Sequence, residues 1–245
     1  MTTDTPLLEA SNVDFAYGDV SILRDVSVSI RAGEVTALIG PNGTGKTTLL
    51  RALAGLQVPT AGSITYHGPE TAREIGYLPQ HPEFRPGFTV LETLRFYASL
   101  VGRGDDDAMA RLESVGLADA ATRQVEALSG GMTRLVGIAQ ATIGDPPLVV
   151  LDEPASGLDP GMSKHVFAVA SELAATGTAV LLSSHDLELV ERTAGEVVML
   201  DRGTVVERGS PTSIRNRLGV DSLQAVYEAS IAGDLSSVRV QGETA

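Results

Sequence analysis

Residues 35–56 read VTALIGPNGTGKTTLLRALAGL, and this stretch decides the fold. It starts with a continuous apolar and β-branched run, VTALIG at 35–40, of the kind found in a strand buried on both faces. The run TTLLRALAGL at 47–56 follows, with leucines at 49, 50, 53 and 56 in the spacing of one helix face. We therefore predict a strand, a glycine-rich loop and a helix in direct succession.

The loop between this strand and helix matches the phosphate-binding pattern of glycine, four residues, glycine, lysine and a hydroxyl residue. Its inner glycines lack a Cβ, so backbone N–H groups can surround phosphate oxygens at the positive N-terminus of the helix. Lys46 is expected to reach the β- and γ-phosphates, and the Thr47 hydroxyl is expected to ligate Mg²⁺. A tight turn that binds nothing is the alternative, but such a turn needs neither the lysine nor two hydroxyls. The predicted nucleotide-binding residues of the loop are Gly40, Pro41, Asn42, Gly43, Thr44, Gly45, Lys46, Thr47 and Thr48.

Two carboxylates end a second apolar run, LVVLDE at 148–153. An aspartate at a strand end beside a phosphate loop can hold the metal, so Asp152 is the predicted Mg²⁺ partner. Glu153 lies one residue further, where it can orient and polarise the water that attacks the γ-phosphate. The alternative is that both acids only cap the following turn or helix. The phosphate loop upstream favours the catalytic interpretation.

Further buried strands and helices alternate along the second half of the chain. Apolar runs at 148–152, 178–184 and 196–201 alternate with helical patterns at about 159–175 and 186–193. Such alternation predicts an α/β fold with a mostly parallel sheet covered on both faces.

Three other regions flank or interrupt this predicted sheet. The stretches 7–17 and 20–30 predict an antiparallel pair, and short strands follow between about 60 and 80. The character is helical from about 88 to 144, which predicts an inserted helical subdomain of approximately 81–144. Within it we expect GRGDDDA at 102–108 to be a solvated loop between two helices. The C-terminal tail, 211–245, should carry one helical patch around Leu223, Val226, Tyr227 and Ile231.

Composition excludes several classes of function. Eighteen Lys and Arg against 31 Asp and Glu give a net charge of −13, which opposes binding to nucleic acid. With no cysteine, the chain has neither disulfides nor thiolate chemistry. The start carries acids instead of a basic stretch with an apolar core, and no apolar run reaches the ~18 residues of a membrane span. We expect one domain of 245 residues in the cytoplasm, brought to any membrane by another chain.

A third motif, LSGGM at 128–132, precedes a helical run. Ser129, Gly130 and Gly131 together present a hydroxyl and exposed amides at a helix start, which is a second phosphate-recognising surface. A simple N-cap of the following helix is the alternative, and it would be preferred if the motif stood alone.

Together these motifs closely resemble the nucleotide-binding subunit of an ABC transporter. The resemblance covers roughly residues 7 to 210, with the motifs in the family's order and spacing. It implies a P-loop NTPase fold of the RecA-like type, in which two subunits bind ATP and Mg²⁺ between them. It also implies separate integral membrane permease subunits as partners, with the protein peripheral on the inner face of the membrane. Within the family, the motif segments most resemble those of the subfamily that serves multidrug, antibiotic or polysaccharide exporters.

The resemblance also assigns roles to single residues. Tyr17 would stack on adenine, and Gln80 would join the two lobes and reach Mg²⁺ and the attacking water. Ser129, Gly130 and Gly131 would contact the γ-phosphate held by the opposite subunit. Asp159, in SGLD at 156–159, would cross the dimer interface, and His185 would contact the γ-phosphate. Tyr17 as a strand-end aromatic, Gln80 as a loop residue and His185 as a helix cap are the respective alternatives.

The LSGGM motif resembles the family's signature sequence but departs from it at the fifth position, where Met132 replaces the usual glutamine. This removes an amide that could contact the opposite nucleotide's sugar, and we expect activity to survive.

Phe84, Phe88 and Phe96 are candidates for docking the membrane partner, although Phe96 is expected to build the lobe's own core. The alternative functions are a soluble ABC ATPase acting on ribosomes or DNA and a small-molecule phosphotransferase. The single module and the acidic charge oppose the first, and LSGGM with SGLD has no purpose in the second.

Overall fold

The computed structural model describes residues 5–231, and its strands form two sheets. One is antiparallel, in the order β2-β1-β4, and contains β1 (Leu8–Tyr17), β2 (Val20–Ile30) and β4 (Ala61–Tyr66). The other has six strands in the order β5-β6-β7-β3-β8-β9. These are β3 (Val35–Ile39), β5 (Ile75–Leu78), β6 (Leu148–Leu151), β7 (Ala179–Ser183), β8 (Glu196–Asp201) and β9 (Thr204–Gly209).

The six-stranded sheet is parallel from β5 to β8 and antiparallel at β9. Its four-residue and five-residue inner strands are entirely buried, because their apolar side chains face a separate hydrophobic core on each side of the sheet. The mostly parallel α/β fold with an antiparallel subdomain and an inserted helical part is therefore confirmed. Strand β9 was not predicted, since TVVERG shows only a short apolar alternation.

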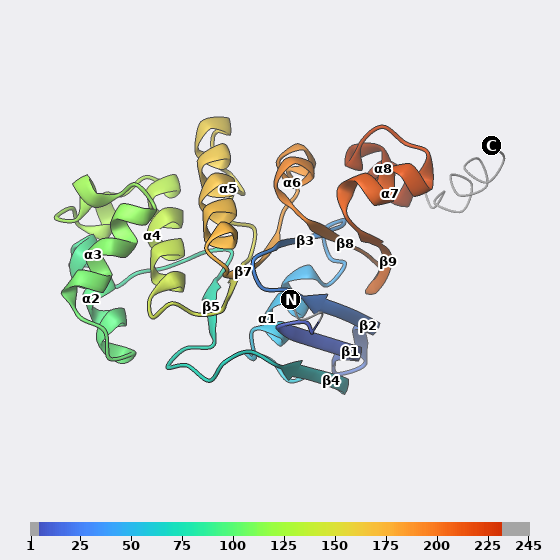
Figure 1. Ribbon diagram of the computed structural model, residues 1–245, viewed down its shortest axis with the longest axis horizontal. Helices are drawn as coiled ribbons and strands as arrows, with labels where there is room; N and C mark the ends of the chain where they lie inside the picture. The colour runs from blue at the N-terminus through green and yellow to red at the C-terminus, as the bar shows by residue number, and fades with distance from the viewer. Residues whose placement is uncertain (1–4, 232–245) are drawn as a thin grey trace.

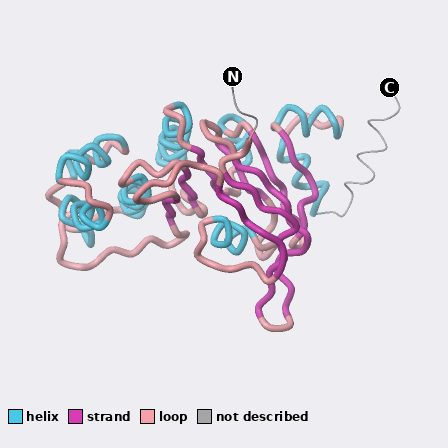
Figure 2. The backbone as a smooth tube through the Cα atoms, turned by 60° about the horizontal axis from the view of Figure 1, so that its bottom comes forward, coloured by secondary structure: helices cyan, strands magenta, loops and turns pink. Residues whose placement is uncertain are grey.

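Eight α-helices lie around the sheets in the described residues. One core combines α1 with the antiparallel sheet, and the other combines the remaining face of the parallel sheet with α4, α5 and α6. Figure 1 shows α2, α3 and α4 grouped at one end of the molecule, beside β5, while α7 and α8 lie at the other end beyond β8 and β9. In Figure 2 most of the strand segments lie to one side of this helical group. The helices are α1 (Lys46–Leu53), α2 (Val90–Leu100), α3 (Asp105–Ser114), α4 (Gly130–Thr142), α5 (Pro160–Ala175), α6 (Leu187–Thr193), α7 (Pro211–Leu218) and α8 (Leu223–Ile231).

The three consecutive aspartates correct the prediction of a loop at 102–108. Asp105, Asp106 and Asp107 form the first turn of α3. Carboxylates are favourable there because they face the positive end of the helix dipole. Asp107 also accepts hydrogen bonds from Arg111, one turn later, at 2.9 and 3.2 Å. A run of acids thus begins a helix here instead of separating two.

Two further expectations need correction. The tail carries two helices in its described part, because Ser210 caps α7 and Pro211 provides a favourable first helical residue. Phe96 does not build the lobe's core, since 55% of its surface is exposed, whereas Phe84 packs partly against the core. Residues 232–245 of the tail lie outside the described residues. No helix in the part of the chain that the structure describes is long and apolar enough to cross a membrane.

Candidate nucleotide-binding site

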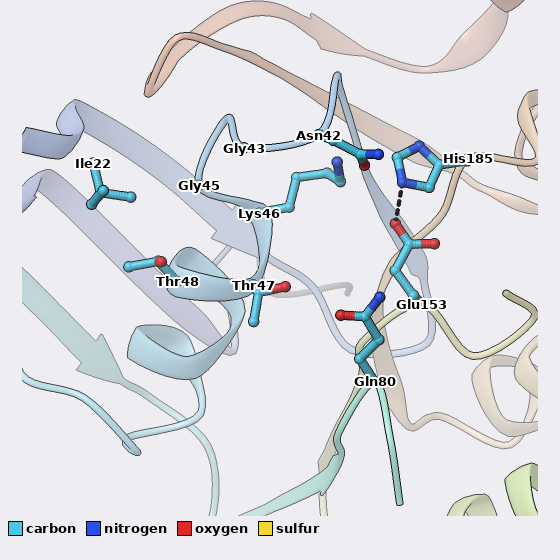
Figure 3. A pocket seen from close by; sticks show the side chains of 10 residues that line it. All are labelled: Ile22, Asn42, Gly43, Gly45, Lys46, Thr47, Thr48, Gln80, Glu153 and His185. Atoms are coloured by element: carbon cyan, nitrogen blue, oxygen red, sulfur yellow. Dashed lines mark ion pairs between the residues drawn. The ribbon is translucent and has the colours of Figure 1, made fainter.

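A cavity of about 470 Å³ opens at the carboxyl ends of the parallel strands. Four neighbouring strands supply its wall: β3 leads into the glycine-rich loop, β5 into Gln80, β6 into Glu153 and β7 into His185. This edge is where ligands bind in open α/β sheets, because the loops leaving adjacent parallel strands converge there. Figure 3 shows the lining residues, which are Ile22, Asn42, Gly43, Gly45, Lys46, Thr47, Thr48, Gln80, Glu153 and His185.

The glycine-rich loop adopts a backbone that needs glycine. Gly45 has φ +99° and begins α1, and a Cβ on it would lie 2.6 Å from the Leu23 side chain. Gly43 has φ +80°. The Thr44 hydroxyl donates to the Pro41 carbonyl at 2.9 Å and braces the loop from inside. The loop and the first residues of α1 line the cavity, so a bound anion would lie at the N-terminus of this helix.

Lys46 is a buried cation beside this loop. Its Nζ donates to the carbonyls of Gly40 at 2.7 Å and Pro41 at 3.0 Å. Burial lowers its pKa, and the nearby Glu153 and Asp152 carboxylates counter that shift. The amine thus lies next to the cavity with acids close by, in a position to pair with phosphate.

Asp152 directly follows β6 and is a fully buried carboxylate. Its Oδ1 accepts hydrogen bonds from Thr47 Oγ1 at 3.2 Å and from Ser183 Oγ at 2.9 Å. The two residues predicted to ligate Mg²⁺, Thr47 and Asp152, therefore lie next to each other in the structure. The described residues contain no cluster of three His, Cys, Asp or Glu side chains suited to a metal. Mg²⁺ needs fewer, since one or two oxygen ligands with substrate phosphates and water suffice, and a hydroxyl beside a carboxylate fits that ion.

Glu153 combines a strained backbone with a buried side chain. Its φ of +48° lies in the left-handed region, which is uncommon outside glycine and costs on the order of 1–3 kcal/mol. Burial raises its pKa, Lys46 and Arg134 oppose that shift, and Asp152 adds to it. His185 Nε2 lies 2.9 Å from Glu153 Oε1, as the dashed line in Figure 3 marks. Burial lowers the pKa of His185, and the nearby Lys46 cation lowers it further.

Gln80 lies half-buried on the cavity wall, opposite the glycine-rich loop (Figure 3). Its backbone carbonyl accepts a hydrogen bond from Arg134 of α4. The residue thus connects the strand side of the cavity with the helical group. Arg134, Ser183 and Ile22 were not predicted as parts of the site. Arg134 carried the only available signal, because a charged side chain interrupts the apolar stretch of a helix.

Tyr17 does not line the cavity. Its ring is 51% exposed, packs edge-on against Phe15 with 5.0 Å between centroids, and accepts a hydrogen bond from Gln57 at 2.8 Å. An exposed aromatic face at the end of β1 is compatible both with base stacking and with the alternative of a strand-end aromatic.

The signature residues and Asp159 also lie outside the cavity. Ser129 is exposed and caps α4 by accepting the Met132 N–H at 3.3 Å, so the N-cap geometry is present. Gly131 is buried, and a Cβ on it would lie 2.8 Å from the Met162 side chain at the start of α5. Asp159 caps that helix by accepting two N–H groups at 3.0 Å. The side chain of Met132 packs against the core.

A second hollow of about 530 Å³ adjoins the first. Glu153 and His185 belong to both hollows and therefore form the wall between them. The far side of the second hollow includes Ser156, Gly157 and Leu158, next to Asp159. The face that carries the predicted interface segment thus begins where the nucleotide cavity ends.

Comparison with known proteins agrees with this geometry. The family model described as ABC transporter matches residues 23–156, which is more than half of the chain. The chain belongs to the ABC transporter family. It is 35% identical to the linearmycin resistance ATP-binding protein of Bacillus subtilis, over 89% of this chain and 73% of that protein. It is also 35% identical to a Nod factor export ATP-binding protein I of Cupriavidus pinatubonensis, over 90% of this chain and 71% of that protein.

Solved structures extend the comparison to the fold. An ATP-binding subunit of an ABC transporter superposes with a TM-score of 0.80 at 32% identity, covering 90% of this chain and 98% of that chain. A dimeric bacterial ABC transporter cassette superposes with a TM-score of 0.76 at 25% identity, covering 83% of this chain and 98% of that one. The chain is an ATP-binding, ATP-hydrolysing subunit of an ABC transporter, and its similar relatives include export proteins.

Proposed function

We propose that two copies of this subunit close around two molecules of Mg²⁺-ATP and that hydrolysis drives export through separate permease subunits. Glu153 carries this proposal, because it is the one carboxylate that lines both hollows. Export is supported by the relatives named for linearmycin resistance and Nod factor export. In this arrangement the chain acts as a single ATPase domain of residues 1–245, in which approximately 81–144 form the helical subdomain.

The residues of the cavity divide the chemistry of hydrolysis among them. Loop amides and Lys46 hold the phosphates and stabilise charge that develops on them. Thr47, Gln80 and Asp152 would hold Mg²⁺, which would neutralise phosphate charge. Glu153 orients and polarises the water and accepts its proton, for which a raised pKa suits it. His185 is proposed to contact the γ-phosphate, and its Nε2 lies 2.9 Å from Glu153 Oε1.

The second copy completes each site. Ser129, Gly130 and Gly131 do not line their own subunit's cavity, and Ser129 is exposed. This helix start would bind the γ-phosphate of ATP held by the opposite Lys46. Asp159 would lie at the interface between copies. Dimer closure then depends on ATP because the γ-phosphate contacts both copies only in the closed state.

The helical group offers a surface for the permease. A small hollow of about 70 Å³ is lined by Arg85, Phe88, Thr93, Phe96 and Tyr97. The Arg85 guanidinium lies 5.0 Å from the Phe88 ring centre, and the Phe96 and Tyr97 rings pack edge-on at 5.4 Å. An exposed aromatic pocket with a cationic edge is a suitable anchor for an apolar helix end of a membrane protein. This would hold the subunit on the inner face of the membrane.

Co-purification from membranes tests this proposal. A tagged wild-type chain should retain a multi-span membrane protein after detergent extraction, and Phe96→Ala should lose most of it. Leu56→Ala is the matched control, because Leu56 is similarly exposed at 58% but lies outside this hollow. Retention of ribosomes or DNA in place of a membrane protein would refute the transport proposal.

A further inference from the structure

Ser183 is a buried serine at the last position of β7, two residues before His185. None of its side chain reaches the cavity surface, and the sequence motifs give it no role. Its hydroxyl nevertheless makes two hydrogen bonds to consecutive residues of the site. The Oγ donates to Asp152 Oδ1 at 2.9 Å and accepts the backbone N–H of Glu153 at 2.8 Å.

We propose that Ser183 is a positioning residue that ties the metal-holding carboxylate and the water-activating glutamate into one unit. Strand register places it there: β6 and β7 run parallel with Leu151 opposite Leu182, so Asp152 and Ser183 leave the sheet side by side. On its other side Ser183 pairs with Leu38, just before the glycine-rich loop. One hydroxyl therefore lies between the strand that supplies the acids and the strand that supplies the phosphate loop.

The donor half of the hydroxyl acts on Asp152. Its O–H points at Oδ1, the same oxygen that accepts from Thr47. Together with the Thr47 hydroxyl on the same oxygen and the Tyr77 hydroxyl, which donates to Oδ2 at 3.5 Å, this donor restricts the rotation of a fully buried carboxylate. The orientation of the second oxygen, Oδ2, is then fixed as well.

The acceptor half acts on Glu153. That residue has φ +48°, a conformation for which a non-glycine residue needs support from its surroundings. Its N–H points inward, and Ser183 Oγ is its partner. Removing the hydroxyl leaves a buried N–H without its partner, and a shift of the backbone at this residue would also move the side chain that lies 2.9 Å from His185.

Magnesium dependence tests this inference, which rests on the proposed metal-holding role of Asp152. Outer partners of metal ligands are typically worth 10- to 100-fold in metal affinity or activity. In Ser183→Ala we expect kcat to fall on the order of 10- to 100-fold, and half-maximal Mg²⁺ to rise by about tenfold or more. Binding of a fluorescent ATP analogue in EDTA should stay within about twofold of wild type, since the loop amides and Lys46 are untouched.

Two variants complete the design. Ser183→Thr keeps the hydroxyl and should recover most of the lost Mg²⁺ affinity. Thr36→Val is the matched control, because Thr36 is a fully buried hydroxyl of the same sheet whose Oγ1 has no hydrogen-bond partner among the described residues. That variant should keep the wild-type Mg²⁺ dependence. If Ser183→Ala does not fold, Ser183→Cys supplies a weaker donor and acceptor and should give a smaller shift in the same direction.

The outcomes separate this inference from the proposed site. Wild-type kcat and Mg²⁺ dependence in Ser183→Ala or Ser183→Cys would overturn the role of Ser183. An equal loss of Mg²⁺-free nucleotide binding would overturn it too, because that pattern belongs to general misfolding. Asp152→Asn should abolish the ATP hydrolysis that Mg²⁺ stimulates. If this variant hydrolyses ATP with the wild-type response to Mg²⁺, the metal-holding role of Asp152 fails as well, whatever Ser183 does.

Discussion

Replacing Glu153 with glutamine removes the charge of the proposed general base and little else. Gln keeps the size of the side chain and an oxygen that can face His185 Nε2, now 2.9 Å from Oε1. It keeps the backbone N–H that Ser183 holds, so the φ of +48° need not change. The lost element is the ability to take a proton from water, and general bases typically contribute 10²- to 10⁴-fold.

The expected loss in kcat is therefore on the order of a hundredfold or more, or about 2.7 kcal/mol of transition-state stabilisation. Phosphate release measured at saturating ATP gives kcat, and size-exclusion chromatography with ATP should show accumulation of an ATP-bound dimer. Glu34→Gln is the control, since burial and Glu196 raise the pKa of Glu34 at the opposite end of β3. It should hydrolyse ATP at the wild-type rate. Wild-type turnover in Glu153→Gln would refute the assignment of the general base.

Three further predictions concern single residues. Lys46→Ala should weaken ATP binding itself, because a cation facing the β- and γ-phosphates is lost, and unchanged affinity by fluorescence titration would remove Lys46 from the site. Tyr17→Ala should weaken ATP and GTP binding alike by roughly 1–3 kcal/mol, since a stacked ring reads the face of a base, and unaltered titrations would leave Tyr17 a strand-end aromatic. Glu153→Gln should also raise Tm, more at pH 8 than at pH 5: the folded-state pKa of Glu153 is raised, so wild type loses stability as pH rises through that pKa and the variant does not. An equal Tm difference at both pH values in differential scanning fluorimetry would contradict the burial of this carboxylate.

The parts of the fold that could be predicted are those specified by local pattern. The buried runs at β3, β6 and β7 are continuous and apolar because both faces of the sheet are covered, and this pattern is visible in the sequence. The glycine-rich loop could likewise be predicted, since its φ values and its helix start require specific residue types at fixed spacing.

The parts that could not be predicted depend on contacts between distant segments. Asp105, Asp106 and Asp107 suggested a loop by charge, whereas the dipole of α3 makes them a favourable first turn. Ser183 and Arg134 meet the site only through strand register and the approach of α4 to Gln80, and no spacing rule connects them to the acids. Phe96 was expected in the core because large aromatic side chains are usually buried. The sequence does not show that Phe96 lies on the exposed face of its helix.

A mixing experiment tests the central claim, a phosphate site shared between two copies, most directly. Lys46→Ala and Ser129→Arg chains, each inactive alone, are combined after subunit exchange is confirmed, and ATP turnover and nucleotide occlusion are measured. One site of the mixed dimer carries both defects, and the other joins an intact phosphate loop to an intact signature. With random pairing and independent sites, half of the dimers have one good site, so turnover should recover to roughly a quarter of wild type. Strict coupling between sites would suppress turnover but leave occlusion. Neither turnover nor occlusion in the mixture would contradict the shared site and leave LSGGM as the N-cap of α4.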